Sequence, residues 1–85
     1  MEYIITFKNT SSAIKAEQCL LAQNLGVTVL PLPSKISSGC GICLRVKQDE
    51  VESALAILAE KNIDEIGLYS RIMENGKYSY EKVGD

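Results

Sequence analysis

The alternation of strand-like and helix-like segments is the feature that most constrains how this 85-residue chain can fold. Runs of β-branched and aromatic residues predict strands over residues 3–7, 27–30, 42–46 and 66–73. Apolar residues at helical spacing predict a helix that begins after the N-cap candidates of residues 9–12 and stops at Gly26. A second helix is predicted over residues 48–61. The order β-α-β-β-α-β predicts an α+β fold of the ferredoxin-like, split βαβ type, built as a sheet covered by two helices.

The end of the chain predicts one more strand. Asn75-Gly76 is a typical turn of a two-residue hairpin, so residues 77–82 are expected to form a fifth, edge strand. We therefore predict a single domain over residues 1–85, with its core in residues 1–73. In this register Arg71 lies opposite Tyr80. The residues expected on one face of the hairpin are Tyr69, Arg71, Tyr78 and Tyr80.

The apolar faces of these segments define a candidate core. The residues expected to contribute to it are Ile5, Phe7, Leu20, Leu21, Val29, Ile42, Leu44, Leu55, Leu58, Ile66 and Leu68.

Composition excludes several classes of function. The chain has no histidine, which removes Ser-His and Cys-His catalysis and any histidine-bound metal. A net charge of −2 and a pI of about 5.1 provide no basic surface for nucleic acid. No apolar run is long enough to cross a membrane, and the start of the chain does not resemble a signal peptide. Three cysteines without such a signal favour the reducing cytoplasm, and we expect no cofactor and no metal.

The segment between the second and third strands carries the strongest chemical signal. It contains two prolines, three serines and the triplet Gly39-Cys40-Gly41. Because neither neighbour of Cys40 has a side chain that could cover it, we expect its thiol to be presented on a shaped loop. This points to thiol or persulfide chemistry, and the alternative is an incidental cysteine in a glycine-rich turn.

A working thiol at Cys40 requires groups that stabilise its anion. The supporting residues expected from the sequence are Lys35, Ser37, Ser38, Gly39, Gly41, Cys43 and Arg45. The positive charges would come from the lysine and the arginine, and backbone N–H groups from the residues between Ser38 and Gly41.

The C-x-x-C spacing of Cys40 and Cys43 also suggests a redox switch. If the segment is extended, the two residues lie roughly 10 Å apart and on opposite faces of the strand. A disulfide needs Cα atoms within about 7 Å, so only a turn at Gly41 would allow one. Cys19 is expected at the edge of the core on the first helix, and three cysteines are too few for a typical zinc or iron–sulfur site.

The loop also carries a resemblance to a known family. The matching residues are Tyr3-Ile4-Ile5-Thr6-Phe7, the pair Ala16-Glu17, and Pro31-x-Pro33-x-x-Ile36-Ser37-x-x-Cys40-Gly41 followed by Leu44-Arg45. In these positions the chain resembles a family of small bacterial proteins described as putative selenium/sulfur carrier protein-like. The resemblance covers about residues 1–69. It implies a cytoplasmic carrier that holds sulfur or selenium on Cys40.

Three hypotheses of function therefore stand side by side. The leading one is a carrier, rather than a stand-alone catalyst, that holds a persulfide or selenopersulfide on Cys40 for transfer between donating and accepting enzymes. The second is a binding or regulatory module that works through its sheet face and has an incidental thiol. The third is a redox switch between Cys40 and Cys43. We also expect a homodimer if the tyrosine-bearing face of the hairpin is left uncovered by the helices.

Overall fold

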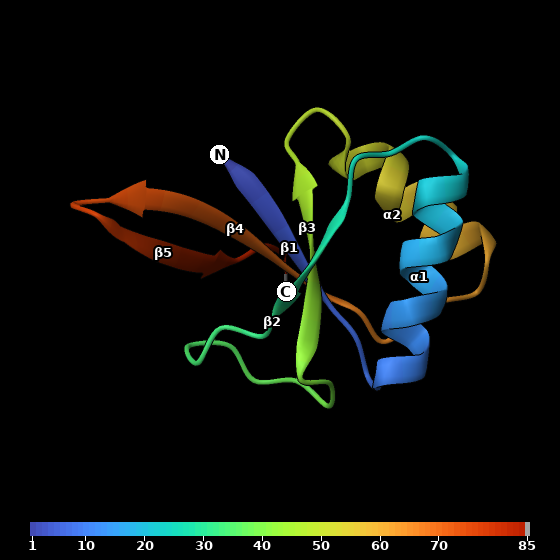
Figure 1. Cartoon of the computed structure of the whole chain (residues 1–85), viewed down its shortest axis with the longest axis horizontal. Helices are drawn as coiled ribbons and strands as arrows, with labels where there is room; N and C mark the ends of the chain where they lie inside the picture. The colour runs from blue at the N-terminus through green and yellow to red at the C-terminus, as the bar shows by residue number, and fades with distance from the viewer. Residues whose placement is uncertain (85) are drawn as a thin grey trace.

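The computed structural model describes residues 1–84 and shows two helices packed on a five-stranded antiparallel sheet (Figure 1). The strands follow the order β2-β3-β1-β4-β5 across the sheet. The elements are β1 (Glu2–Thr6), α1 (Thr10–Ala22), β2 (Thr28–Pro31), β3 (Ile42–Lys47), α2 (Val51–Glu60), β4 (Gly67–Glu74) and β5 (Lys77–Lys82). Their order along the chain is the predicted one, so the α+β class is confirmed. No helix within residues 1–84 is long and apolar enough to span a bilayer.

The predicted end of α1 is wrong. The helix begins as expected, with the Asn9 side chain accepting a hydrogen bond of 2.8 Å from the N–H group of Ser12. It stops at Ala22, however, and Asn24, rather than Gly26, follows it in the left-handed conformation (φ 64°) in which many helices end. The second helix is also shorter than predicted, because it starts only at Val51.

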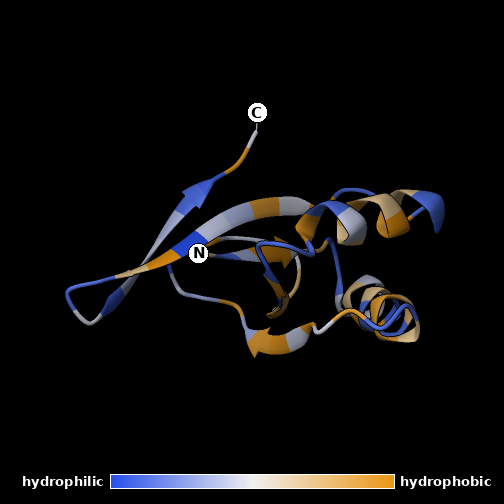
Figure 2. Ribbon diagram, turned by 90° about the horizontal axis from the view of Figure 1, so that it is seen from above, coloured by the Kyte–Doolittle hydropathy of each residue, from blue (hydrophilic) through white to orange (hydrophobic). Residues whose placement is uncertain are grey.

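Both helices cover the same face of the sheet, and the main core lies between the helices and that face (Figures 1 and 2). Of the predicted core residues, two are exposed: Leu21 (48%) and Val29 (37%). Leu21 lies on the outer side of α1, and Val29 belongs to the edge strand β2, which the helices cover poorly. The others are buried or partly buried against the core: Ile5, Phe7, Leu20, Ile42, Leu44, Leu55, Leu58, Ile66 and Leu68.

The β4–β5 hairpin forms as predicted and projects from the body of the molecule (Figure 1). Asn75 (φ 51°) and Gly76 (φ 77°) both have the positive φ that a type I′ turn requires. The expected pairing of Arg71 with Tyr80 is present. Figure 2 shows hydrophilic residues at the tip of the hairpin.

The face of the sheet without helices carries a second, smaller apolar cluster. Its buried members are Ile4, Ile36 and Cys43. Partly buried residues that pack against it are Leu30, Leu32, Tyr69 and Tyr80. Because Ile36 comes from the segment between β2 and β3, this loop is folded back onto the helix-free face.

Candidate functional site

The candidate site is the loop of residues 32–41, which joins β2 to β3 at the lower side of the molecule in Figure 1. The N–H group of Leu32 donates to the carbonyl of Gly41 at 2.9 Å and closes the base of the loop. Within it, the N–H group of Ile36 donates to the carbonyl of Pro33 at 3.0 Å. The loop therefore has a fixed base and an internal turn, as the prolines and serines led us to expect.

The expectation that the Cys40 thiol is presented to solvent is wrong, because Cys40 is only 3% exposed and belongs to the main core. The cause is Gly39, whose backbone lies against the carbonyl group of Lys8. A Cβ atom at position 39 would lie 2.2 Å from that carbonyl oxygen. Because glycine has no side chain, the backbone at position 39 can lie against that carbonyl group, and Cys40, the next residue, then points into the core.

The sulfur of Cys40 lies at the start of α1. Its Sγ atom donates to Oγ1 of Thr10, the first residue of the helix, at 3.7 Å. The first N–H groups of a helix have no partner within the helix, and this end carries a positive partial charge. The side chain of Cys40 therefore lies beside the end of α1 that carries this partial charge.

Ser38 holds the backbone of Cys40 in place. The N–H group of Cys40 donates to Oγ of Ser38 at 3.1 Å, and this hydroxyl donates to the Cys40 carbonyl at 2.9 Å. Of the predicted supporting residues, Ser38 thus contacts Cys40 directly and Gly39 sets its position. Gly41 supplies the carbonyl that closes the loop, and Ser37 is exposed.

The two predicted cationic partners of Cys40 have other partners. Lys35 Nζ donates to the Tyr78 carbonyl on β5 at 3.5 Å. Arg45 points to the helix-free face, since it alternates with Leu44, whose side chain packs under the helices. The group that lies beside the sulfur is instead Thr10 at the start of α1. The N-cap signal of residues 9–12 could have suggested this, but nothing in the sequence places that helix end beside Cys40.

Cys43 is fully buried in the cluster on the helix-free face, and its Sγ atom donates to the Pro31 carbonyl at 3.8 Å. Burial raises the pKa of its thiol to about 11, against a weaker opposing effect of the positive charge on Arg71. Cys43 is therefore a protonated, unreactive thiol at neutral pH. The cysteines of the C-x-x-C pair belong to separate clusters, as the alternation of side chains predicted, and the third, Cys19, is partly exposed on α1.

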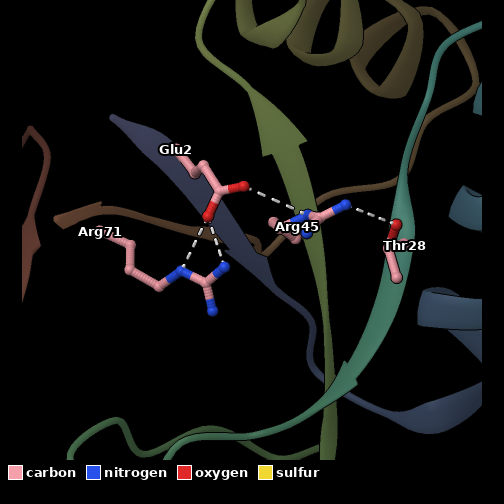
Figure 3. A network of polar contacts seen from close by, with 4 residues as sticks. All are labelled: Glu2, Thr28, Arg45 and Arg71. Carbon is pink, nitrogen blue, oxygen red and sulfur yellow. Dashed lines mark hydrogen bonds and ion pairs between the residues drawn. The ribbon is translucent and has the colours of Figure 1, made fainter. Parts of the chain in front are cut away.

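The helix-free face also carries a polar network across four strands (Figure 3). Glu2 accepts hydrogen bonds from Arg71, and its other oxygen lies 3.5 Å from Nε of Arg45, which donates to Thr28 at 3.0 Å. The hydrogen bond from Arg71 is the main reason that the pKa of Glu2 is lowered. Arg71 also lies 4.0 Å from the centroid of the Tyr78 ring. The sequence predicted that Arg71 and Tyr78 share a face, but it did not identify Glu2 as their partner.

A cavity of about 380 Å³ opens beside the loop. Its polar lining includes Lys8, Ser37, Ser38, Glu65 and Lys82. Because Lys8 forms ion pairs of 3.4 Å with Asp64 and Glu65, its charge is already balanced. No group of three or more cysteine, aspartate or glutamate side chains within residues 1–84 is placed to hold a metal ion.

Comparison with known proteins gives one finding on the family. The family model described as "Putative Se/S carrier protein-like" matches residues 2–70 of the chain. This range includes the whole candidate loop and ends within β4, before the hairpin turn. A search of curated proteins finds no match.

Proposed function

Since the chain belongs to the putative Se/S carrier protein-like family, we propose that it carries sulfur or selenium on Cys40 between a donating and an accepting enzyme. The observation that carries this proposal is the contact between the Cys40 sulfur and Thr10 at the start of α1. A carrier cysteine must react as a thiolate to accept its cargo, and a helix N-terminus favours that charge.

The transfer requires no net oxidation. The Cys40 thiolate attacks the outer sulfur of a persulfide on the donor, the S–S bond of the donor breaks, and the donor leaves as a thiolate. Cys40 then carries a persulfide, or a selenopersulfide if the outer atom is selenium. On delivery, a nucleophile of the acceptor attacks the outer atom, and Cys40 leaves as a thiolate ready for another cycle. The role is thus that of a carrier rather than a stand-alone catalyst.

The buried environment of Cys40 suits such a cargo. Persulfides decompose when other thiols reach their outer sulfur by exchange. A sulfur held in the core, with a backbone fixed by Ser38, is shielded from small thiols in solution. The cytoplasm, where such thiols are abundant, is the compartment in which we propose that the protein works.

The two alternative functions fit the geometry less well. A redox switch between Cys40 and Cys43 would require the loop to leave the core, because the two residues are buried in different clusters. A binding module without a working thiol would use Cys40 only as a small core residue, and the match to the carrier family favours a working thiol instead. The tyrosine-bearing hairpin remains a candidate surface for docking or for a homodimer.

The experiment that tests the proposal loads the protein with a cysteine desulfurase and L-cysteine as sulfur donors. Peptide mass spectrometry should then find one extra sulfur atom on Cys40, removable by a reductant. Cys40→Ser should abolish loading, whereas Cys19→Ser and Cys43→Ser, which change the other two thiols, should retain it. Loading that depends on Cys19 or Cys43 instead would contradict the proposal.

A further inference from the structure

The burial of Cys40 raises the question of how a donor reaches it. Sulfur exchange requires the attacking sulfur to approach the receiving sulfur directly, along the axis of the breaking S–S bond. A side chain that is 3% exposed within the core offers no such approach. The loop must therefore open, and what controls access to Cys40 is whatever holds the loop closed.

Only two residues of the loop are buried, and they lie on opposite faces of the sheet. Ile36 is 5% exposed and packs with Ile4 and Cys43 on the helix-free face. Cys40 packs on the helix side. The residues between them are exposed, and Gly39 crosses against the carbonyl of Lys8, just beyond the end of β1. The loop thus passes around the end of the sheet and packs one side chain on each face, Cys40 on the helix side and Ile36 on the helix-free side.

The remaining attachments of the loop are weaker. Lys35 contributes an exposed hydrogen bond of 3.5 Å to the Tyr78 carbonyl. The contact between the sulfur and Thr10 at 3.7 Å is also long, as hydrogen bonds of sulfur are. The hydrogen bond between Leu32 and Gly41 joins the two ends of the loop to each other. It does not attach the residues between them to the sheet. Leu32, at the base of the loop, also packs against the cluster on the helix-free face but is only partly buried there, whereas Ile36 is buried.

We propose that Ile36 is the positioning residue that gates Cys40. When Ile36 leaves its cluster, the segment to Cys40 is released and the thiol becomes accessible. When Ile36 returns, the loaded sulfur is enclosed again. A docking donor or acceptor would open the site by competing for the apolar side chain of Ile36. This inference rests on the proposed carrier role, but its test requires no sulfur donor.

The test measures how fast iodoacetamide alkylates Cys40, with the labelled peptide identified by mass spectrometry. If opening precedes labelling, the rate is proportional to the population of the open loop. Ile36→Ala removes most of the side chain that is buried on the helix-free face, and we expect labelling to be more than about tenfold faster, because the lost burial exceeds that of a tenfold change in equilibrium. Ile36→Val should accelerate labelling only about two- to threefold.

Leu30→Ala provides the matched control. Leu30 belongs to the same cluster but lies on β2, outside the loop. It should change labelling of Cys40 much less than Ile36→Ala does. In both variants the free energy of opening obtained from Cys40 labelling should stay well below the free energy obtained from hydrogen exchange of the β1 amides, which separates loop opening from global unfolding. An unchanged labelling rate in Ile36→Ala, an equal rise in Leu30→Ala, or a labelling free energy equal to that of β1 exchange would each contradict the proposed gate. Failure of sulfur loading with a normal labelling response would instead overturn the carrier role alone.

Discussion

The Sγ atom of Cys40 lies 3.7 Å from Oγ1 of Thr10, the residue with which α1 begins. This contact joins a loop between two strands to the start of a helix 30 residues earlier in the chain. It gives a buried sulfur both a hydrogen-bonding partner and the positive end of a helix. The chemistry proposed for Cys40 depends on this pairing.

Replacing Thr10 with Val should speed the loss of sulfur from loaded Cys40 to small thiols by about three- to tenfold, because the hydroxyl contact that helps to hold Cys40 in the core is worth about 1 kcal/mol. The change keeps the shape of the side chain. Ser11→Ala is the control, since it removes an exposed hydroxyl from the same helix turn. Mass spectrometry of the loaded protein during incubation with glutathione gives both rates. Equal acceleration in the two variants would show that Thr10 acts only through helix stability.

A pair of glycine substitutions tests how the loop is positioned. Gly39→Ala should destabilise the fold by about 1–3 kcal/mol, because its Cβ would lie 2.2 Å from the Lys8 carbonyl oxygen. Gly41→Ala should be close to neutral, since a Cβ there meets nothing within 4 Å. Urea denaturation measures both free energies of unfolding. Similar losses in the two variants would contradict the close approach at Gly39.

The ion pair of Glu2 makes a contribution to stability that depends on pH. The pKa of Glu2 in the folded protein is lowered from its usual value of 4.5, chiefly by the hydrogen bond from Arg71. A lowered folded-state pKa adds stability that is fully present above the unfolded value and is lost as the pH falls through the folded value. Glu2→Gln should therefore cost about 1 kcal/mol at pH 7 and much less at pH 3, since Glu2 is partly exposed.

Urea denaturation at the two pH values measures this difference. Glu81→Gln, which changes an exposed carboxyl group on β5, serves as the control and should change stability little at either pH. A cost for Glu2→Gln that is the same at pH 3 as at pH 7 would show that the carboxylate charge is not what Arg71 stabilises.

Self-association is expected through the projecting hairpin. Met73 (57% exposed) and Tyr78 (41%) face each other across β4 and β5 and leave apolar surface uncovered. The double change Met73→Ser and Tyr78→Ser should shift a dimer to monomers in light scattering at high micromolar concentration. Leu21→Ser, at an exposed apolar position on α1, should leave the mass unchanged. A wild-type protein that is monomeric at that concentration would remove the prediction.

The sequence predicted the features that depend on neighbouring residues. The hairpin register follows from the Asn75-Gly76 turn, because the turn itself fixes which residues pair. The N-terminus of α1 was likewise predictable from Asn9 as a capping residue. These features need no knowledge of distant parts of the chain.

The predictions that were wrong concern features that depend on contacts between distant segments of the chain. Cys40 is buried because the backbone of Gly39 lies against the carbonyl group of Lys8. The residues next to the cysteine in the sequence do not predict this contact. Val29 is exposed because its strand lies at the edge of the sheet. Arg45 points away from Cys40 because the pleat of β3 fixes its side. The local pattern singled out Cys40 as the candidate thiol but did not predict its environment.

The most direct test of the central claim follows a sulfur atom into and out of the protein. The chain is loaded with isotopically labelled sulfur from a cysteine desulfurase, separated from the donor, and mixed with an acceptor thiol. We predict that the label sits on Cys40, leaves with the acceptor, and that the emptied protein can be loaded a second time. Label that settles on Cys19 or Cys43, or that stays on Cys40 and blocks a second loading, would contradict a carrier role.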